Sequence, residues 1–548
     1  MISWLLFAAT ALAIAPVDDV IPSSIEAVLA TPDDPIAFGL PLLLEAQVVT
    51  ERRLSGTGRC AVDLGDVNGD GLADYAVGVG PDGRGKSLWV LDGTTNRTIW
   101  SASPGKGSFR SLRGLSHHEG RLALGVSSPR GLVQVRDTAR GQVVWSRSFA
   151  PASREGAHVS SVRWGPDLNA DGQRDLLVAG GGGIESAMAL SGTDGSTLWE
   201  HTANDVVMDA LAVHDQDEDG LLDILVVGGE TAPFARLLSG LHGAVLWEQS
   251  LDGVGSVGMG MDDINGDGQL DVVVGQFAEP AACVLALDGA SGSRLWGSQD
   301  VTRNVTSLAL VGDNLGTGFR DVAVGSFDNA VSVVLGFNGN TVWRREVSTF
   351  NGGSMLSVIK TADLDGNGSQ DVLASSLDHR IYLYGGTTGQ FMAMWKSGQK
   401  LAAVATLGDI TGDGRPEVLA GGSRVTAVLD GSMGLASGPQ LDLEPPTTLD
   451  EPLGVILWSY PGTQVILWAS LGTDANRAPG AFGIFGLDLS SLVTLYQGPT
   501  PGAGGVTLAF DALPPSAAGL AVWLQAVSIY SPSHAILSNV NSFHVPVD

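Results

Sequence analysis

Short apolar runs rich in valine recur along roughly the first 430 residues, and glycine-rich or aspartate-rich turns separate them. Examples are DVVVG at residues 271–275 and CVLAL at residues 283–287. Such runs are too short for helices, and their β-branched residues favour strands. In one unit of the pattern, strands are expected near residues 255–262, 270–277, 282–288 and 293–298. Each unit therefore predicts a small sheet of four antiparallel strands.

An aspartate-rich segment of nine residues sets the period of this pattern. Its copies are DVNGDGLAD from Asp66, DLNADGQRD from Asp167, DQDEDGLLD from Asp215, DINGDGQLD from Asp263, DNLGTGFRD from Asp313, DLDGNGSQD from Asp363 and DITGDGRPE from Asp409. The successive intervals are 101, 48, 48, 50, 50 and 46 residues. The first interval equals two periods, so a unit that lacks the segment is expected near residues 112–125. The period predicts about eight units, with seven as the alternative.

A tryptophan holds one position of the same period. The seven tryptophans are Trp100, Trp145, Trp199, Trp247, Trp296, Trp343 and Trp395. A large aromatic side chain repeated in phase is typical of packing between neighbouring units. We therefore expect each tryptophan to join two sheets.

Repeated small sheets are most stable when they close into a ring, because closure leaves few unpaired strand edges. The eighth unit ends after Asp430 without a tryptophan strand, and residues 43–50 (LLEAQVVT) precede the first unit at the matching distance. We expect this N-terminal strand to complete the last unit. The predicted fold is an all-β propeller of four-stranded blades over residues 43–440.

The aspartate-rich segment has the composition of a cation-binding loop. Oxygen side chains stand at positions 1, 3, 5 and 9, a glycine at position 6 permits a sharp turn, and position 7 can offer a carbonyl. Hard oxygen ligands in a flexible loop suit Ca²⁺ better than Mg²⁺. Aspartate–glycine turns solvated by water are the alternative for any single copy, but several copies in phase favour a cation. About five to six calcium ions are expected.

The expected side-chain ligands are Asp66, Asn68, Asp70 and Asp74 in the first unit, Asp167, Asn169, Asp171 and Asp175 in the third, Asp215, Asp217, Asp219 and Asp223 in the fourth, Asp263, Asn265, Asp267 and Asp271 in the fifth, Asp363, Asp365, Asn367 and Asp371 in the seventh, and Asp409, Thr411, Asp413 and Glu417 in the eighth. The expected carbonyl ligands at position 7 belong to Leu72, Gln173, Leu221, Gln269, Ser369 and Arg415. The sixth unit places Leu315 and Thr317 at ligand positions, so no metal is expected there.

Residues 59–81 (RCAVDLGDVNGDGLADYAVGVGP) resemble the FG-GAP or VCBS-type repeat of integrin α-subunit propellers and of many bacterial surface proteins. The resemblance extends over about residues 43–431, although the Phe-Gly pair and most Gly-Ala-Pro ends of that repeat are missing. It implies calcium-binding loops on one face of a propeller. Asp66, Asn68, Asp70 and Asp74 and their counterparts would be the ligands.

The formal net charge of −29 argues against a nucleic-acid partner, because phosphate contacts need clustered cations. The first 13 residues read as a signal peptide cleaved near residues 13–15, and residues 14–42 as a linker, which predicts secretion or display at the cell surface. No later apolar stretch is long enough to span a membrane. Cys60 and Cys283 lie in distant units and are expected to be buried free thiols.

After residue 440 the pattern changes to a Pro-rich linker at 441–452 and alternating strands at 453–548, which fit a small β-sandwich.

We expect a monomeric, non-enzymatic binding or adhesion module for an extracellular protein or glycan, with structural calcium. The alternative is a propeller enzyme that resembles polysaccharide lyases or quinoproteins. The sequence offers no G-x-S-x-G or H-E-x-x-H motif, and the adjacent His117 and His118 are expected to be solvated. Partner binding is expected on the face away from the loops. The links expected there contain the cationic residues Arg84, Lys106, Arg110, Arg147, Arg154, Arg344 and Arg345.

Overall fold

The computed structural model describes residues 48–80, 86–104, 107–109, 111, 113–126, 128, 131–149, 157–278, 282–301, 303–346, 355–364, 368–389, 391–397, 399–412 and 414–431 of the repeat region. In the C-terminal region it describes residues 440–444, 453–458, 464–470, 479–480, 483–484, 493–499, 505–510, 521–531, 534–537 and 541–544. The predicted signal peptide and the linker that follows it lie outside the described residues. The chain divides into two compact units, one formed by Ala46–Gly389 with Met394–Met433 and the other mainly by Gly434–Asp548.

The described residues of the first compact unit form strands, turns and irregular links, with a single 3₁₀ residue at Pro104. Its strands are β1 (Val48–Gly65), β2 (Asp74–Val79), β3 (Leu88–Leu91), β4 (Thr98–Ala102), β5 (Leu115–His118), β6 (Arg121–Val126), β7 (Leu132–Asp137), β8 (Val143–Ser148), β9 (His158–Trp164), β10 (Leu176–Gly181), β11 (Ser186–Leu190), β12 (Thr197–Thr202), β13 (Val207–Ala212), β14 (Ile224–Gly228), β15 (Phe234–Leu238), β16 (Val245–Ser250), β17 (Val254–Gly260), β18 (Val272–Phe277), β19 (Val284–Leu287), β20 (Arg294–Gly297), β21 (Val305–Leu310), β22 (Val322–Ser326), β23 (Ala330–Val334), β24 (Thr341–Glu346), β25 (Met355–Lys360), β26 (Val372–Ser376), β27 (Arg380–Tyr384), β28 (Phe391–Lys396), β29 (Leu401–Leu407) and β30 (Glu417–Leu429).

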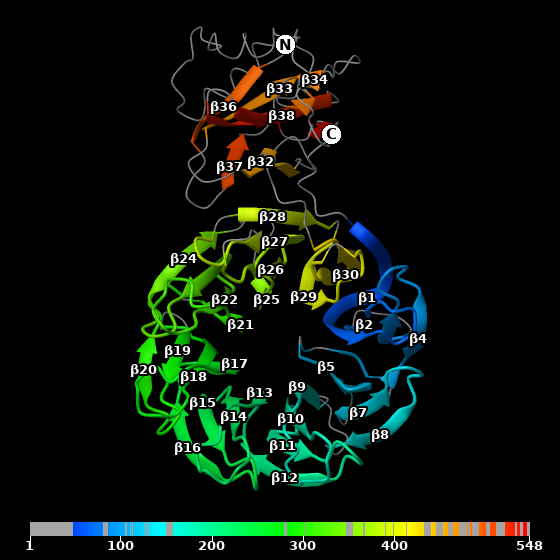
Figure 1. The fold of residues 1–548 in the computed structure, drawn as a ribbon, viewed down its shortest axis with the longest axis vertical. Helices are drawn as coiled ribbons and strands as arrows, with labels where there is room; N and C mark the ends of the chain where they lie inside the picture. The colour runs from blue at the N-terminus through cyan, green and yellow to red at the C-terminus, as the bar shows by residue number, and fades with distance from the viewer. Residues whose placement is uncertain are drawn as a thin grey trace. The chain divides into compact units, whose positions relative to one another are not determined.

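These strands form sheets around a central opening (Figure 1). Within each unit the strands pair in chain order and antiparallel, as expected from the sequence. The first strands of neighbouring units contact one another around the ring, from β1 through β5, β9, β13, β17, β21 and β25 to β29, which again contacts β1. The all-β propeller fold is therefore confirmed.

The number of separate blades differs from the expected eight. The ring has seven sheets, of which six have four strands and one has six, in the order β29-β30-β1-β2-β3-β4. The reason is the length of β1, whose 18 residues pair first with β30 and then with β2. The strands assigned by sequence to the first and eighth units are thereby joined in one continuous sheet. The terms first to eighth unit refer to the sequence repeats and not to the sheets.

Ring closure uses the N-terminal strand, as the sequence predicted. Val48 pairs with Leu429, and the pairing continues to Thr57 opposite Ser423. Residues 43–47 of the predicted strand lie outside the described residues. Because the two ends of the repeat region share one antiparallel ladder, the ring has no open edge at this junction.

The hydrophobic core lies between the faces of neighbouring sheets. The second strand of each unit is covered on both faces, and every residue of β10 and β14 is buried. One core cluster combines Leu177 and Ala187 of the third unit with Ile224 and Val226 of the fourth. Strands buried on both faces lack the alternation of half-exposed strands, which explains the continuous runs in the sequence.

The repeated tryptophans join consecutive units. Trp145, Trp199, Trp247, Trp296 and Trp343 each donate from Nε1 to a backbone carbonyl in the turn of the next unit, at 2.7–3.0 Å. Each ring also lies against a glycine of that turn, where a Cβ would come within 2.7 Å of the ring. The predicted role of these tryptophans between sheets is confirmed.

The C-terminal unit contains further strands. They are β31 (Gln440–Glu444), β32 (Leu453–Trp458), β33 (Gln464–Ser470), β34 (Pro479–Gly480), β35 (Gly483–Ile484), β36 (Val493–Pro499), β37 (Gly505–Phe510), β38 (Ala521–Ser531), β39 (His534–Leu537) and β40 (Asn541–His544). They form a three-stranded, a five-stranded and a two-stranded sheet. β31 occupies the start of the predicted Pro-rich linker, whose remainder lies outside the described residues. The β-sandwich stays a prediction.

Cys60 and Cys283 are both buried thiols, as expected, and Cys283 Sγ donates to the carbonyl of Ala278 at 2.6 Å. Burial raises the pKa of the Cys60 thiol well above its ordinary value, so the thiol stays protonated and unreactive at neutral pH. Among the described residues, no helix has the length and apolar character needed to cross a membrane.

Candidate metal sites and the surrounding framework

Each aspartate-rich loop connects the first and second strands of its unit. The position 1 carboxylate accepts hydrogen bonds from backbone N–H groups at later positions of the same loop. In the fifth unit, Asp263 Oδ2 accepts from Gly268 N at 2.9 Å, and Oδ1 accepts from Asp267 N at 3.2 Å. Gly268 has φ +95°, and a Cβ there would meet no neighbouring atom. The glycine at position 6 is therefore needed for its backbone conformation and not for space.

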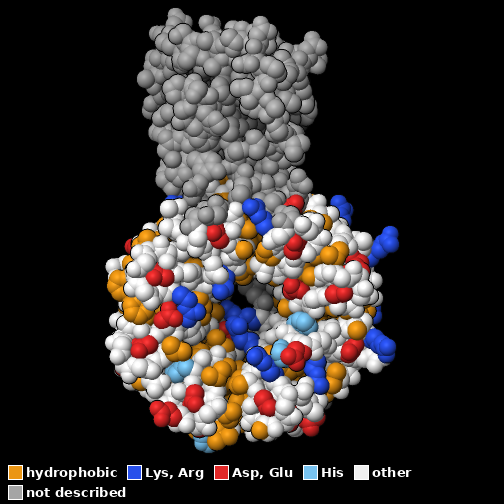
Figure 2. Space-filling model, in the orientation of Figure 1, with side chains coloured by type: hydrophobic (Ala, Val, Ile, Leu, Met, Phe, Trp, Pro, Cys, Tyr) orange, Lys and Arg blue, Asp and Glu red, His pale blue; other side chains and the backbone are white. Residues whose placement is uncertain are grey.

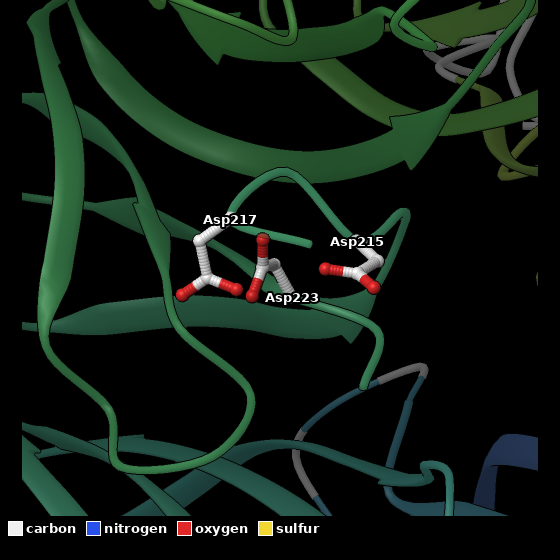
Figure 3. Close-up of side chains that lie close together, drawn as sticks. All are labelled: Asp215, Asp217 and Asp223. Atoms are coloured by element: carbon white, nitrogen blue, oxygen red, sulfur yellow. The ribbon is translucent and has the colours of Figure 1, made fainter. Parts of the chain in front are cut away.

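The fourth unit brings three carboxylates together. One oxygen each from Asp215, Asp217 and Asp223 lies within 4.8 Å of the other two. Figure 3 shows the three side chains side by side, with Asp223 between the others. Three negative charges at this separation repel one another strongly unless a cation lies among them. Among the described loops, the carboxylate cluster of the fourth unit gives the best support for a site that fits a hard divalent cation.

The position 9 carboxylate has a second role in the framework. Asp271 is fully buried; its Oδ2 accepts from Ile264 N at 2.8 Å and its Oδ1 from Gly289 N at 2.9 Å. Asp175, Asp223, Asp321 and Asp371 make the same pair of contacts in their own units. Position 9 thus connects its loop to the turn between the third and fourth strands.

Burial raises the pKa of Asp74, Asp175, Asp223, Asp271 and Asp321 above the ordinary aspartate value, although the backbone N–H groups partly oppose this. Neighbouring loop carboxylates raise it further, as Asp267 and Asp288 do for Asp271. The protein alone therefore compensates the charged form of position 9 only in part. A bound cation would supply the rest.

The turn glycine that contacts position 9 cannot be replaced without a clash. A Cβ at Gly289 would lie 1.9 Å from the carbonyl oxygen of Leu270, and the equivalent glycines of other units have the same close approach. The carbonyl of Gly289 also accepts the bond from Trp247 Nε1 at 2.8 Å. A continuous path of contacts therefore runs from the loop carboxylate Asp271 through the turn to the tryptophan of the preceding unit.

The structure places the other predicted ligands in a repeated arrangement. The position 3 oxygen accepts from the N–H of position 5, and the position 5 carboxylate accepts from the N–H of position 7. This holds for the loops of the first, third, fourth and fifth units. Asp365, Asn367 and Asp413 lie outside the described residues, so the seventh and eighth loops are described only in part.

The sixth loop keeps the backbone framework without the ligands. Asp313 accepts from Thr317 N and Gly318 N, at 2.8 and 2.7 Å. Leu315 at position 3 is 54% exposed and offers no oxygen side chain. The loop conformation therefore forms in this structure with or without a full set of ligands.

The second unit reverses the charge at position 9. β5 and β6 are joined by the two-residue turn Glu119–Gly120, and the residue that stands where other units have aspartate is Arg121. Arg121 Nη1 donates to the carbonyl of Gly192 in the third unit at 2.8 Å. The missing loop was visible in the sequence, but this substitution was recognisable only from strand register.

His117 and three arginines expected in the links between strands have surroundings that differ from the sequence-based expectation. His117 is half-buried, its Nε2 is enclosed without a hydrogen-bond partner among the described residues, and burial lowers its pKa. Arg147, Arg344 and Arg345 lie in strands β8 and β24 and not in links. Arg147 and Arg345 donate to carbonyls of Gly195 and Gly389, so they do not form a free binding patch.

A charged network that sequence reasoning missed lies on the first strands of the ring. Asp209 of β13 is fully buried and accepts from Arg163 Nε and Nη2 at 3.0 and 2.9 Å. Arg113 also approaches Asp209, at 3.4 Å, and reaches the carbonyls of Ser256 and Thr306. Although burial opposes ionisation, Arg163 and Arg113 lower the pKa of Asp209 to about 2. No spacing in the sequence links these residues, because three different units contribute them.

The fold and the loops together define the class of this protein as an all-β propeller, and comparisons with known families support that class. The sequence model of the FG-GAP-like repeat matches residues 363–420. The sequence model of the outer membrane protein assembly factor BamB matches residues 84–268. The chain is therefore similar to two propeller families over different parts. No curated protein matches this sequence.

Of three similar solved structures, one has a TM-score above 0.5 and supports the fold. Sqt1 from Saccharomyces cerevisiae is 12% identical, with 70% of this chain and 99% of that chain covered and a TM-score of 0.53. BamB from Moraxella catarrhalis is 12% identical over the same shares, with a TM-score of 0.46. The computationally designed Ika8 protein is 14% identical over the same shares, with a TM-score of 0.49. At such identities the likeness to Sqt1 concerns the fold alone.

Proposed function

We propose that this chain is a secreted or cell-surface β-propeller that binds structural calcium and acts as a non-catalytic binding or adhesion module. Its partner would be an extracellular protein or glycan. The single observation that carries the calcium proposal is the carboxylate cluster of Asp215, Asp217 and Asp223 within 4.8 Å, set in a loop whose framework recurs around the ring. Oxygen-rich, flexible loops of this kind suit Ca²⁺.

The residues that would hold calcium are those at positions 1, 3, 5 and 9, with the carbonyl at position 7. The bound ion would neutralise carboxylates that otherwise repel one another. Position 9 already contacts the turn that receives the tryptophan of the preceding unit. Calcium binding at Asp271 would therefore stabilise the junction between two sheets as well as the loop itself.

The expected energy is modest at each loop and substantial in total. At about 1 mM external calcium and a dissociation constant of about 10⁻⁴ M, each site adds about 1.4 kcal/mol by mass action. Five or six such sites would add about 7–8 kcal/mol, which is comparable with the net stability of a whole domain. Removal of calcium should therefore lower the unfolding temperature markedly.

A metal count on purified protein tests the calcium proposal, with one matched pair of variants. Asp263→Asn alters position 1 of a loop with a full ligand set, and Asp313→Asn makes the same change where the ligand set is incomplete. We expect five to six calcium ions per chain in the native protein, one fewer in Asp263→Asn and no change in Asp313→Asn. A metal-free native chain that is equally stable in EDTA would refute the proposal.

Export and partner binding need their own tests. N-terminal sequencing of the exported chain should find cleavage near residues 13–15, and an uncleaved cytoplasmic chain would contradict secretion. A glycan array together with capture of cell-surface proteins would separate the two partner classes. Turnover of an acidic polysaccharide by the purified chain would favour the enzyme alternative instead.

A further inference from the structure

A cavity of about 380 Å³ lies at the loop end of the third and fourth units, beside the second. Its walls include Arg163, Trp164 and Arg174 of the third unit, Leu211 and Leu222 of the fourth, and Ser116 of the second. Both charged residues that line it are cationic, and no carboxylate lines it, in a chain with a formal charge of −29. On the face drawn in Figure 2, Lys and Arg side chains gather around the central opening of the ring.

The missing loop of the second unit explains why a cavity occurs at this place. The chain links β5 to β6 through Glu119–Gly120 alone, whereas the third unit has a full loop between β9 and β10. Trp164, at the end of β9, extends toward the shortened unit. Its Nε1 donates to Ser116 O at 3.3 Å, and its ring centroid lies 6.1 Å from that of His118. The ring is partly buried against the core of the third unit, and Trp164 also lines the cavity.

The two arginines that line the cavity differ in whether an ion pair engages their charge. Arg163 makes a bidentate pair with buried Asp209, which fixes its side chain and offsets its charge. Arg174 stands at position 8 of the third loop, is exposed, and has no hydrogen-bond or ion-pair partner among the described residues. Because Arg113 also pairs with Asp209, the buried network keeps one positive charge and Arg174 adds another, so the cavity favours an anionic ligand.

We propose that this cavity binds a carboxylate-bearing sugar ring, as found in a uronic acid residue of an acidic glycan. Arg174 would hold the carboxylate and Trp164 would face the ring, while Leu211 and Leu222 exclude water from its apolar side. A cavity of 380 Å³ lies at the small end of the range for ligand sites, which fits one sugar ring. The inference rests on the proposed binding function and places its glycan on the loop face, not on the opposite face.

Two substitutions test the site, and the repeat supplies a matched control for the second. Arg174→Gln removes the free cation. Leu222→Glu places a negative charge at the rim, and Leu270→Glu makes the same change at position 8 of the next loop, outside the cavity. Leu222 and Leu270 are 42% and 48% exposed, so neither substitution disturbs the core.

Binding of D-glucuronate to the calcium-loaded full chain is measured by titration calorimetry, with D-glucose as the neutral match. We expect glucuronate to bind at least about tenfold more tightly than glucose, because a hydrogen bond between two charged groups is about twice as strong as one between neutral groups. Arg174→Gln and Leu222→Glu should each weaken glucuronate binding by about tenfold or more. Leu270→Glu should leave it unchanged.

Several outcomes would overturn the inference. They are equal binding of glucose, absence of glucuronate binding to the native chain, an equal loss in Leu270→Glu, or equal binding of an acidic peptide such as N-acetylglutamate amide. The calcium count of each variant is measured in the same preparation. A native chain with a full calcium count and no glucuronate binding would separate failure of this inference from failure of the calcium proposal.

Discussion

The position 9 carboxylate permits a test that separates the loop framework from the metal. Asp271 and Asp321 are both fully buried, and each accepts one N–H from its loop and one from a turn glycine. Of the two units that contain these residues, the fifth has oxygen side chains at all the other ligand positions, whereas the sixth has Leu315 at position 3. Asp271→Asn and Asp321→Asn are therefore the same chemical change with and without a predicted calcium site.

In EDTA the two variants should lose similar amounts of unfolding free energy. The asparagine keeps one acceptor but presents an amide to the second backbone N–H, which costs about 1–3 kcal/mol for a buried contact. Asp271 has two neighbouring carboxylates, Asp267 and Asp288, that disfavour its charge, whereas Asp313 alone acts on Asp321. Removal of the charge therefore relieves more repulsion at Asp271 than at Asp321. In EDTA, Asp271→Asn should lose no more unfolding free energy than Asp321→Asn.

In about 1 mM calcium the order should reverse. The native chain and Asp321→Asn keep the site of the fifth unit, while Asp271→Asn loses it and with it about 1.4 kcal/mol. Urea unfolding followed by tryptophan fluorescence, with and without calcium, measures both differences. If calcium leaves the gap between the two variants unchanged, position 9 is structural only and the metal assignment of this loop fails.

Three further predictions concern the framework and the charged network. Trp247→Phe removes the Nε1 bond to Gly289 and should lower stability by about 1–2 kcal/mol in calcium and EDTA alike, as measured by urea unfolding. Gly289→Ala should destabilise by more than Trp247→Phe, because its Cβ would lie 1.9 Å from the carbonyl of Leu270; an alanine variant of native stability would contradict this geometry. The native pKa of Asp209, about 2 against an ordinary 3.8, contributes about 2 kcal/mol above pH 4 that is lost as the pH falls toward 2. Asp209→Asn leaves Arg163 without its counter-charge, so its stability deficit should shrink over that pH range, and a constant deficit in acid unfolding in EDTA would refute the pairing.

Local pattern was enough to predict the elements of the repeat. Period, glycine positions and valine-rich runs gave four antiparallel strands per unit, and the strands of the fifth unit lie within a few residues of their predicted bounds. The role of five of the repeated tryptophans and the closing N-terminal strand were also predicted correctly. These features follow from nearest-neighbour contacts, which a repeat encodes in each copy.

Long-range features needed the tertiary structure. The blade count depended on the continuous pairing of β1 with both β30 and β2, which a period of fifty residues cannot reveal. The second role of position 9 appeared only when a turn from the other end of the unit was seen to contact it.

The sequence by itself determined the propeller class, the unit length and the chemistry of the candidate calcium loops, because each of these is written within about fifty consecutive residues. Only the tertiary structure decided which charges meet. Arg113, Arg163 and Asp209 come from three units and share one buried network, and residues of three units line the cavity beside Arg174. Such juxtapositions arise from ring closure, which brings together residues that no local pattern connects.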